Sequence, residues 1–290
     1  MRMAFFSTNR LPEGRNLSRM SIQSKLNKIH CADSLSFMQN LPDATFSLII
    51  CDGPYGITQF DWDRVSNIQD FNLELLKNFA RLLKPGGSAY LFGKQDCLDF
   101  IDYRPYLKLN SRIVWYQPSR LAQGRLKYTN NYDIIAHFSK GSAETFNLDD
   151  IRVPQLVELE HRLRCENVPS VKNGKFGATR FDTRGKNPGD VWGDIKQLTY
   201  RSKELLDRKF LNTIQKPEKL IERLVRASSN PEDIIFDPFS GTGTVALVAN
   251  RLKRNFIAVE RDRQLWQLSN MRLSEATETA ANEPPVSAAV

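Results

Sequence analysis

The sequence lacks the features that would place a protein in a membrane or hold it together covalently. No apolar run approaches the roughly 20 residues that a membrane-spanning helix needs, and the start of the chain does not resemble a secretory signal. The cysteines are scattered and form no Cys-x-x-Cys pair, which disfavours a zinc site or a disulfide framework: Cys31, Cys51, Cys97 and Cys165. These absences predict a cytoplasmic protein with no metal site and no membrane partner.

Positive charge is present in excess and is unevenly distributed. The 290 residues carry a net charge of +8, and residues 150–216 hold 14 Lys and Arg against 9 Asp and Glu. Glycines and aromatics are interleaved with these charges in KNGKFGATRFDTRGKNPGDVW at 172–192. A basic surplus can simply favour solubility, but a clustered one suits a phosphate backbone, from which Lys and Arg displace counterions.

Two regions of the chain, 28–140 and 212–277, alternate apolar runs with amphipathic stretches. With 41% hydrophobic residues the chain can bury a sizeable core. Alternation of this kind predicts an α/β fold, a mostly parallel sheet with helices on both faces. The expected strands lie at 46–50, 88–93, 111–116, 132–138, 233–237 and 256–260, and the expected helices at 71–83, 218–229, 244–252 and 263–273.

The remaining parts of the chain lack this rhythm. Residues 1–27 and 278–290 are read as terminal tails. Residues 141–211 are basic and loop-rich, and are typical of an insertion outside the sheet, with one helix expected at 152–164.

A carboxylate and an aromatic ring follow the apolar run at 46–50, in the sequence CDGPYG at 51–56. A turn at a strand end requires only residues such as Gly53 and Pro54. Asp52 and Tyr55 are surplus to the turn, which makes them candidates for chemistry. A core aromatic is the ordinary alternative for Tyr55.

A second strand end carries a glycine loop, in DIIFDPFSGTGTVALVANRL at 233–252. Gly241 and Gly243 allow the backbone to approach a ligand, although an ordinary strand-to-helix turn explains a lone Gly-x-Gly equally well. Asp237 ends the first strand and Glu260 ends the next. Asp237 would repel a pyrophosphate and suits a ligand with an ammonium or sulfonium group, and Glu260 is placed to accept hydrogen bonds from ribose hydroxyls. S-adenosylmethionine has all of these groups.

These stretches resemble a known family. FDPFSGTGT followed by FIAVE resembles the cofactor motifs of S-adenosylmethionine-dependent methyltransferases, and CDGPYG resembles the Asp-Pro-Pro-Tyr motif of DNA amino-methyltransferases. The order is catalytic motif, basic insertion, cofactor loop, which is the circularly permuted arrangement of the β class of adenine-N6 and cytosine-N4 enzymes. RLLKPGGSAYLF, NNYDIIAHFSKG and NPGDVW agree in place. The resemblance covers most of 28–140 and 188–276.

The resemblance implies a Rossmann-like methyltransferase fold and a set of site residues. Asp52, with the backbone carbonyl of Gly53, would hold the target amine of a base flipped out of duplex DNA, and Tyr55 would stack on that base. Asp237 would bind the methionine amino group and Glu260 the ribose. Further cofactor contacts are implied for Asp33, Lys216, Pro217, Phe239, Gly241, Thr242 and Gly243.

Some assignments have alternatives. Asp33 would equally serve as an N-cap for the helix in SLSFMQNL, and Lys216 could be an exposed lysine. Gly53 departs from the family pattern, which has Pro there, so an inactive DNA-binding relative is one alternative to an active enzyme. The Asp-led motif favours adenine-N6 over cytosine-N4 methylation.

The family context also bears on partners. Residues 141–211 are the candidate target-recognition region. A restriction endonuclease partner and a homodimer are both compatible with the family. The Asp-Trp-Asp run at 61–63 is given no role.

Overall fold

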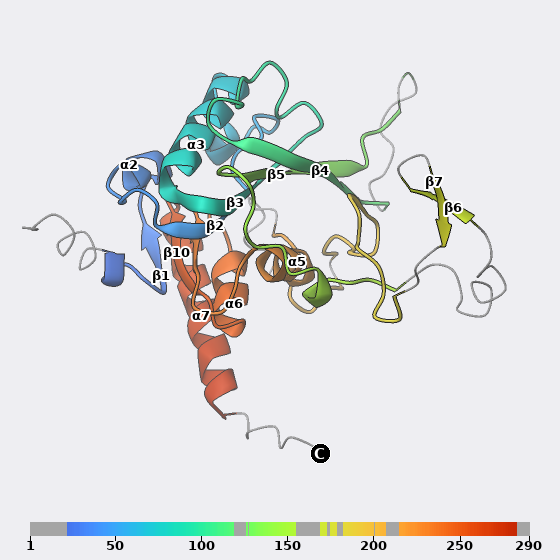
Figure 1. The fold of residues 1–290 in the computed structure, drawn as a ribbon. Coiled ribbons are helices and arrows are strands. Elements are labelled where there is room, and N and C mark those ends of the chain that lie inside the picture. The colour runs from blue at the N-terminus through green and yellow to red at the C-terminus, as the bar shows by residue number, and fades with distance from the viewer. Residues whose placement is uncertain are drawn as a thin grey trace, which may run out of the picture.

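The computed structural model of the chain is an eight-stranded sheet with helices on both faces (Figure 1). It describes residues 22–118, 126, 128–154, 169–172, 175–178, 182–199, 201–206 and 215–282. The predicted α/β architecture is confirmed.

The sheet interleaves the two alternating regions of the chain. Its order is β1-β10-β9-β2-β3-β5-β4-β8, so strands from the second region lie between strands of the first. The strands from β1 to β3 run parallel, β5 is antiparallel to both of its neighbours, and β4 and β8 pair in parallel. The strands are β1 (Lys28–Cys31), β2 (Phe46–Cys51), β3 (Leu83–Gly93), β4 (Lys108–Tyr116), β5 (Tyr132–Ser139), β8 (Val191–Trp192), β9 (Ile234–Asp237) and β10 (Asn255–Glu260).

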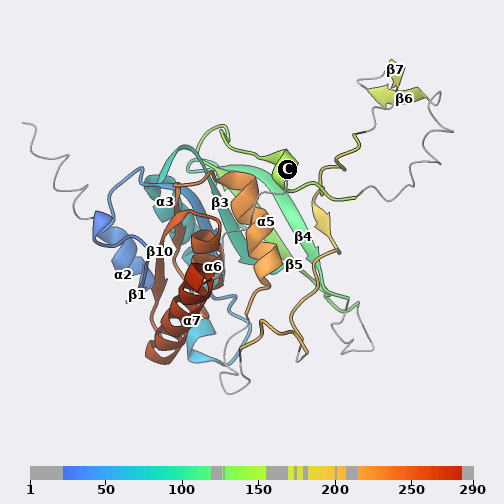
Figure 2. The same cartoon turned by 90° about the horizontal axis from the view of Figure 1, so that it is seen from below.

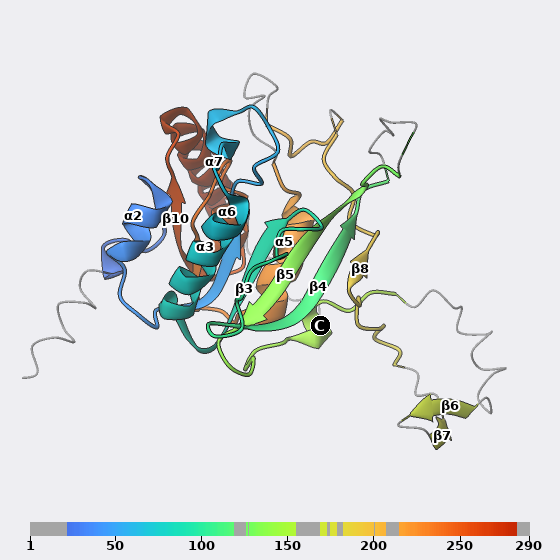
Figure 3. The ribbon, with the colours of Figure 1, turned by 90° about the horizontal axis from the view of Figure 1, so that it is seen from above.

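Helices cover each face because alternate side chains of the central strands are apolar on both sides. Along β2, Ile49 and Cys51 join one buried cluster, and Leu48 and Ile50 join the other. Figure 3 shows α2 and α3 over one face, and Figure 2 shows α5, α6 and α7 over the other. The helices are α2 (Ser34–Gln39), α3 (Ile68–Leu82), α5 (Glu218–Ser228), α6 (Thr244–Arg251) and α7 (Arg263–Asn282), with 3-10 turns η1 (Asp61–Asp63) and η2 (Leu148–Asp150).

Several boundaries differ from those expected, and three of them change how the chain is divided. β3 begins at Leu83 and includes the Lys-Pro-Gly-Gly stretch, because a bulge in its pairing with β2 and a positive φ of 76° at Gly86 accommodate the turn. α7 continues to Asn282, beyond the start of the predicted tail at 278. At the other end, residues 22–27 contact the sheet, since the Asn27 backbone N–H donates to the Phe256 carbonyl at 2.7 Å.

The middle region is partly integrated into the sheet, and the expectation that it lies wholly outside is therefore wrong for Val191 and Trp192. These residues form β8 and pair with β4. A separate hairpin, β6 (Pro169–Lys172) with β7 (Lys175–Ala178), forms its own two-stranded sheet. Most of the helix expected at 152–164 lies outside the described residues, and its beginning is instead a loop in which Val153 bridges to Lys186.

Two arginines of the middle region are committed to ion pairs. Arg152 contacts Asp149 at 2.7 Å and Asp182 at 3.2 Å, and Arg184 contacts the same carboxylates at 2.5 and 2.8 Å. These four side chains, of alternating charge, thus join residues 149–152 to residues 182–184. These arginines contribute to folding the region as well as to its positive charge.

Membrane-spanning and metal-binding features are both missing from the residues that the structure describes. In that part of the chain, no helix combines the length and the apolar character required to traverse a bilayer. Within the same residues, His, Cys, Asp and Glu side chains do not gather in threes around a possible metal position.

Candidate active site

The carboxyl ends of β2, β9 and β10 meet at one edge of the sheet and open into a shared cavity of about 1260 Å³. Parallel strands bring their ends together in this way, and ligands of open α/β sheets bind at that edge. Asp52 follows β2, Asp237 ends β9 and Glu260 ends β10, and all three line the cavity. The two motifs of the sequence therefore face one space.

The Asp52 carboxylate is held by two partners. Its Oδ2 atom lies 2.5 Å from the Nζ atom of Lys216, and its Oδ1 atom accepts a hydrogen bond from the Tyr55 hydroxyl at 2.8 Å. The Lys216 side chain is only 7% exposed, so its charge and that of Asp52 compensate each other away from bulk water. A carboxylate has about four lone-pair sites, so Asp52 keeps acceptor capacity for a ligand.

Tyr55 lies within a polar part of the cavity wall. Burial raises the pKa of its hydroxyl well above 10.0, and the negative charges of Asp52 and Asp133 act in the same direction. The hydroxyl therefore remains protonated and donates to Asp52. The ammonium groups of Lys94 and Lys216 each lie 5.5 Å from the centre of the Tyr55 ring, within the range of a cation–π contact.

Behind Tyr55, three polar side chains from the antiparallel part of the sheet form a chain of contacts. Lys94 Nζ lies 2.7 Å from Asp133 Oδ1, and Gln117 Nε2 donates to Asp133 Oδ2 at 2.8 Å. All three residues line the cavity. The sequence analysis missed them. Asp133 stands at the start of β5, and because β5 is antiparallel, its start lies at the same edge as the ends of β2 and β3.

Gly53 touches the cofactor-loop side of the cavity. A β-carbon added at Gly53 would lie 3.2 Å from two ring atoms of Phe239, so the phenyl ring covers the catalytic turn. This close approach links the two motifs directly. It also gives a physical reason for a residue without a side chain at position 53.

The part of the cavity beside the glycine loop, called the cofactor corner here, contains the carboxylates of Asp237 and Glu260. Neither has a cation partner among the described side chains. Asp237 is 3% exposed and accepts a hydrogen bond from the Phe239 backbone N–H at 3.2 Å. Burial raises the pKa of Asp237 well above 3.8, and the neighbouring charges of Asp52 and Glu260 add to this effect. Burial also raises the pKa of Glu260, although hydrogen bonds from backbone N–H groups oppose it.

The loop between β9 and α6 is shaped for close backbone approach. Gly241 and Gly243 have φ values of 52° and 79°, and a β-carbon at Gly243 would lie 2.9 Å from that of Ser269. The Gly241 N–H donates to Glu260 Oε2 at 2.7 Å, which joins the loop to the next strand end. The Ser240 hydroxyl is buried beside the cavity and has no hydrogen-bond partner among the residues that the structure describes.

These features fit S-adenosylmethionine. The carboxylates of Asp237 and Glu260 provide negative charge for a cationic ligand with hydroxyl groups. The Ser240 hydroxyl has hydrogen-bonding capacity left for a ligand. The loop glycines leave room for the ligand against the backbone.

Asp33 has the capping role that the sequence offered as an alternative. Its side chain accepts a hydrogen bond from the Ser36 backbone N–H at 2.9 Å and caps α2. It also lines the cavity. The Ser34 hydroxyl donates to the Pro238 carbonyl and so ties the start of α2 to the glycine loop. Capping and cofactor contact are therefore compatible at Asp33.

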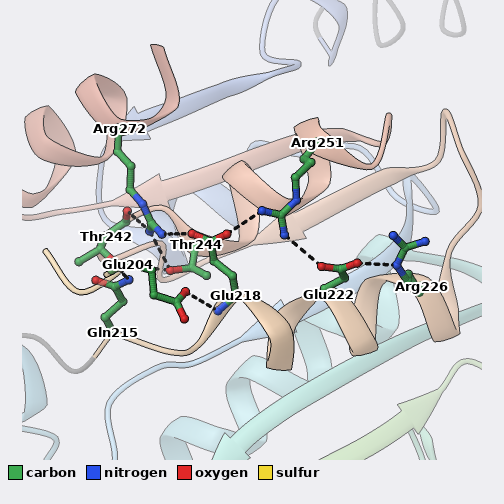
Figure 4. A network of polar contacts seen from close by, with 9 residues as sticks. All are labelled: Glu204, Gln215, Glu218, Glu222, Arg226, Thr242, Thr244, Arg251 and Arg272. Atoms are coloured by element: carbon green, nitrogen blue, oxygen red, sulfur yellow. Dashed lines mark hydrogen bonds and ion pairs between the residues drawn. The ribbon is translucent and has the colours of Figure 1, made fainter. Parts of the chain in front are cut away.

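A polar network behind the cavity connects the glycine loop to the segment that carries Lys216 (Figure 4). Arg272 of α7 donates to the Thr242 carbonyl at 3.2 Å and lies 2.6 Å from Glu218, at the start of α5. Gln215 donates to the Glu204 carbonyl at 2.7 Å. The network fixes the backbone on both sides of Lys216, so the ammonium group reaches Asp52 from a held position.

Most of the predicted site residues converge on the cavity. Asp33, Asp52, Gly53, Pro54, Tyr55, Lys216, Asp237, Phe239, Gly241, Thr242 and Glu260 line it. Pro217 and Gly243 do not appear on its wall. Pro217 stands at the N-cap of α5, and Gly243 shapes the turn into α6.

Comparisons with known proteins agree with this geometry. A family profile described as DNA methylase, of the N6/N4 type, matches residues 46–271. The type II methyltransferase M.BglII of Bacillus subtilis is 31% identical over 273 residues, which are 89% of this chain and 72% of the relative. The DNA adenine methyltransferase YhdJ of Escherichia coli K12 is 32% identical over 265 residues, 87% of this chain and 84% of the relative.

Solved structures share the fold. The PvuII cytosine-N4-specific DNA methyltransferase superposes with a TM-score of 0.60 at 17% identity, covering 86% of this chain and 89% of the other. A DNA modification methylase of Thermus thermophilus, complexed with S-adenosylmethionine, gives a TM-score of 0.57 at 18% identity over 86% and 93%. This chain belongs to the N6/N4 DNA methylase family, whose members take their methyl group from S-adenosylmethionine.

Proposed function

We propose that this DNA methyltransferase acts on the exocyclic N6 amine of an adenine flipped out of duplex DNA. The observation that supports the proposal most strongly is the position of Asp52. Its carboxylate, paired with Lys216 and Tyr55, faces the same cavity as the buried carboxylates that suit the cofactor. An amine held by Asp52 would meet a methyl group presented from the glycine-loop side.

The chemistry requires help because the lone pair of an exocyclic amine is conjugated with the ring. Asp52, joined by the Gly53 carbonyl, would accept hydrogen bonds from the amine and favour a tetrahedral nitrogen with its lone pair free. Lys216 and Tyr55 restrain the Asp52 carboxylate in one orientation and leave it acceptor capacity. As the nitrogen bonds to the methyl carbon, the bond from that carbon to the sulfur of the cofactor would break, with its electron pair going to sulfur. The nitrogen would lose a proton, for which we propose Asp52 as the acceptor.

The cofactor supplies a methyl group on a positively charged sulfur. We assign its ammonium end to Asp237 and its ribose hydroxyls to Glu260, because Asp237 is buried and Glu260 is partly buried, and neither carboxylate has a cation partner among the described residues. Phe239, Gly241 and Thr242 would line its path, and Asp33 would contact the adenine end. Lys216, expected from the resemblance on the cofactor side, borders both ligands through its contact with Asp52.

The DNA base must leave the duplex to reach Asp52. The Tyr55 ring offers a stacking surface worth roughly 1–3 kcal/mol per base. We assign target recognition to the middle region, 141–211. Its net positive charge suits DNA phosphates, although Arg152 and Arg184 are already held by Asp149 and Asp182.

Adenine is proposed over cytosine because the catalytic motif begins with Asp, and because YhdJ, named as a DNA adenine methyltransferase, is 32% identical over most of both chains. Cytosine-N4 methylation is the second candidate. The similarity in fold to the PvuII enzyme, which is named as cytosine-N4-specific, favours it. A DNA-binding relative without activity is the third, motivated by Gly53.

Two partners and a location belong to the same proposal. The type II methyltransferase M.BglII is a relative at 31% identity, and a restriction endonuclease acting at the same sites is proposed as a functional partner here. A homodimer on DNA is the proposed assembly. The substrate implies that the protein works in the cytoplasm.

One experiment separates the three candidate functions. Plasmid DNA from a methylation-deficient host is incubated with the protein and S-adenosylmethionine labelled in the methyl group, and the digested nucleosides are separated. The proposal predicts label in N6-methyladenosine. Label in N4-methylcytidine would support the second candidate, and DNA binding without label would support the third.

A further inference from the structure

The Asp-Trp-Asp run at 61–63, which the sequence left without a role, contains the carboxylate that holds the loop after the catalytic motif. Asp63 accepts hydrogen bonds from four consecutive backbone N–H groups. Its Oδ1 atom accepts from Tyr55 at 2.5 Å and Gly56 at 2.9 Å, and its Oδ2 atom accepts from Ile57 at 2.9 Å and Thr58 at 2.6 Å. Asp63 itself is 1% exposed.

Burial of apolar side chains contributes little to the shape of this loop. Gly56, Ile57 and Phe60 are exposed, and Ile57 is 61% exposed. Ile57 therefore buries little apolar surface that could hold this part of the loop. The loop also requires a left-handed residue, since Gly56 has a φ of 69°. A curved run of N–H groups around one anion is a stable arrangement, and here the anion is a side chain of the same loop.

The carboxylate is suited to this task in charge and geometry. Burial works to raise the pKa of Asp63, but hydrogen bonds from Thr58, Tyr55 and Gly56 prevail and lower it, so the group stays ionised. η1, which carries Asp63, is attached in turn to the cofactor side of the site. Arg261, the residue after Glu260, donates to the Asp61 carbonyl at 3.0 Å.

Tyr55 is where the loop meets the proposed chemistry. Its backbone N–H donates to Asp63 and its hydroxyl donates to Asp52. One end of the residue is therefore set by Asp63, and the other end restrains the catalytic carboxylate. Loss of the first contact would leave the Tyr55 ring and hydroxyl free to shift.

We propose that Asp63 is a positioning residue for methyl transfer. It gathers the four N–H groups, sets the place of Tyr55, and through Tyr55 orients Asp52 toward the target amine. The inference rests on the proposed function and deepens it. Asp63 touches neither the cofactor nor the base in this scheme, so its loss should lower kcat without affecting cofactor affinity.

Asp63→Asn tests the proposal with almost no change in size. An amide has one acceptor oxygen, and its NH2 group would face two N–H donors, so the loop must rearrange. We expect kcat to fall about a hundredfold, the loss that a displacement of about 1 Å causes in a reacting site. The dissociation constant for S-adenosylmethionine, measured by calorimetry, should stay within twofold of the wild type. The binding stoichiometry from the same calorimetric titration gives the fraction of the protein that is folded and binds the cofactor.

Matched variants separate positioning from general stability. Asp61→Asn removes the same charge from the same 3-10 turn, where the Asp61 side chain is 90% exposed, and should leave kcat unchanged. Gly56→Ala strains the loop from its other side without a steric clash, because the nearest atom to the new β-carbon would be 3.7 Å away. Gly56→Ala should lower kcat several-fold if methyl transfer depends on the loop conformation. This variant also tests the proposal if Asp63→Asn fails to fold.

A double-mutant cycle completes the experiment. If Asp63 acts through Tyr55, the loss in Asp63→Asn combined with Tyr55→Ala should be much smaller than the product of the single losses. The inference would be overturned if the fold-losses in kcat of the two single variants multiply in the double variant, or if Asp63→Asn keeps the wild-type kcat. It would also be overturned if Asp63→Asn loses cofactor binding together with kcat. A wild-type protein that transfers no methyl group would instead refute the proposed function.

Discussion

Two carboxylates at neighbouring strand ends, Asp52 and Asp237, have opposite surroundings. Asp52 is paired with Lys216 and accepts from the Tyr55 hydroxyl. Asp237 is buried, accepts one hydrogen bond from the Phe239 N–H, and its pKa is raised because burial disfavours the charge and Asp52 and Glu260 repel it. Charge is thus compensated at the catalytic corner, whereas at the cofactor corner no cation in the described part of the chain compensates it.

The difference indicates which chemical group each corner is suited to bind. A carboxylate already satisfied by its own protein can orient a neutral amine, since it has acceptor sites left and its position is fixed. A buried carboxylate without a partner gains most from a cation, because the ligand's charge removes the penalty of burial.

Removal of the catalytic carboxylate should have the largest effect. Asp52→Ala is expected to lower the rate of methyl transfer by about a thousandfold or more, since the amine loses the group that activates and orients it. Cofactor affinity should change little, because Asp237 and Glu260 remain. Rates measured with labelled cofactor and affinities measured by calorimetry check both statements. A variant that loses both properties together would show that the corners are not separate.

Removal of the compensating cation should come next. Lys216→Met leaves the Asp52 carboxylate without its ion-pair partner and with one restraint fewer, and kcat should fall roughly 10- to 100-fold. Lys219→Met is the matched control, because Lys219 lies three residues further along, in the first turn of α5, and is exposed. The comparison fails if the two substitutions have the same effect on kcat.

The cofactor corner should respond to pH. Because burial raises the pKa of Asp237 above 3.8, this group takes up a proton at a higher pH than an ordinary carboxyl does, and a cationic ligand must displace that proton. Affinity for S-adenosylmethionine should therefore decrease as the pH falls, with proton release on binding. Asp237→Asn should weaken binding about tenfold at neutral pH and reduce the pH dependence. Calorimetry in buffers of different ionisation enthalpy measures both; a pH-independent affinity in the wild type would contradict the assignment.

The contact between the corners should give the smallest effect. In Gly53→Ala the new β-carbon would lie 3.2 Å from the Phe239 ring, so the ring must yield slightly and kcat should fall only a few-fold. A kcat equal to that of the wild type would mean that the ring adapts freely.

Much of the fold could be predicted because it is encoded locally. The apolar runs at 46–50 and 233–237 are long enough to be strands, and the residues after them carry the motifs. Parallel pairing then brings Asp52 and Asp237 to one edge. Strand direction is not encoded in this way: nothing in the sequence of β5 shows that it is antiparallel, and so the convergence of Asp133 with Lys94 was missed.

The rest of the site depends on contacts that no local pattern predicts. Lys216 reaches Asp52 across 164 positions in the chain, and the sequence indicated only that it belongs near the cofactor. The role of Asp63 depends on the conformation of residues 55–58, which its own carboxylate sets. A helix was expected at 152–164, but residues 152–154 form a loop with an isolated bridge from Val153 to Lys186.

The most direct test of the account is a calorimetric titration of S-adenosylmethionine into the wild type, Asp52→Ala and Asp237→Asn at neutral pH, with methyl transfer measured on the same samples. We expect Asp52→Ala to bind like the wild type but to transfer methyl groups more slowly by about a thousandfold or more, while Asp237→Asn binds about tenfold more weakly. Weak binding by Asp52→Ala together with unchanged binding by Asp237→Asn would contradict it.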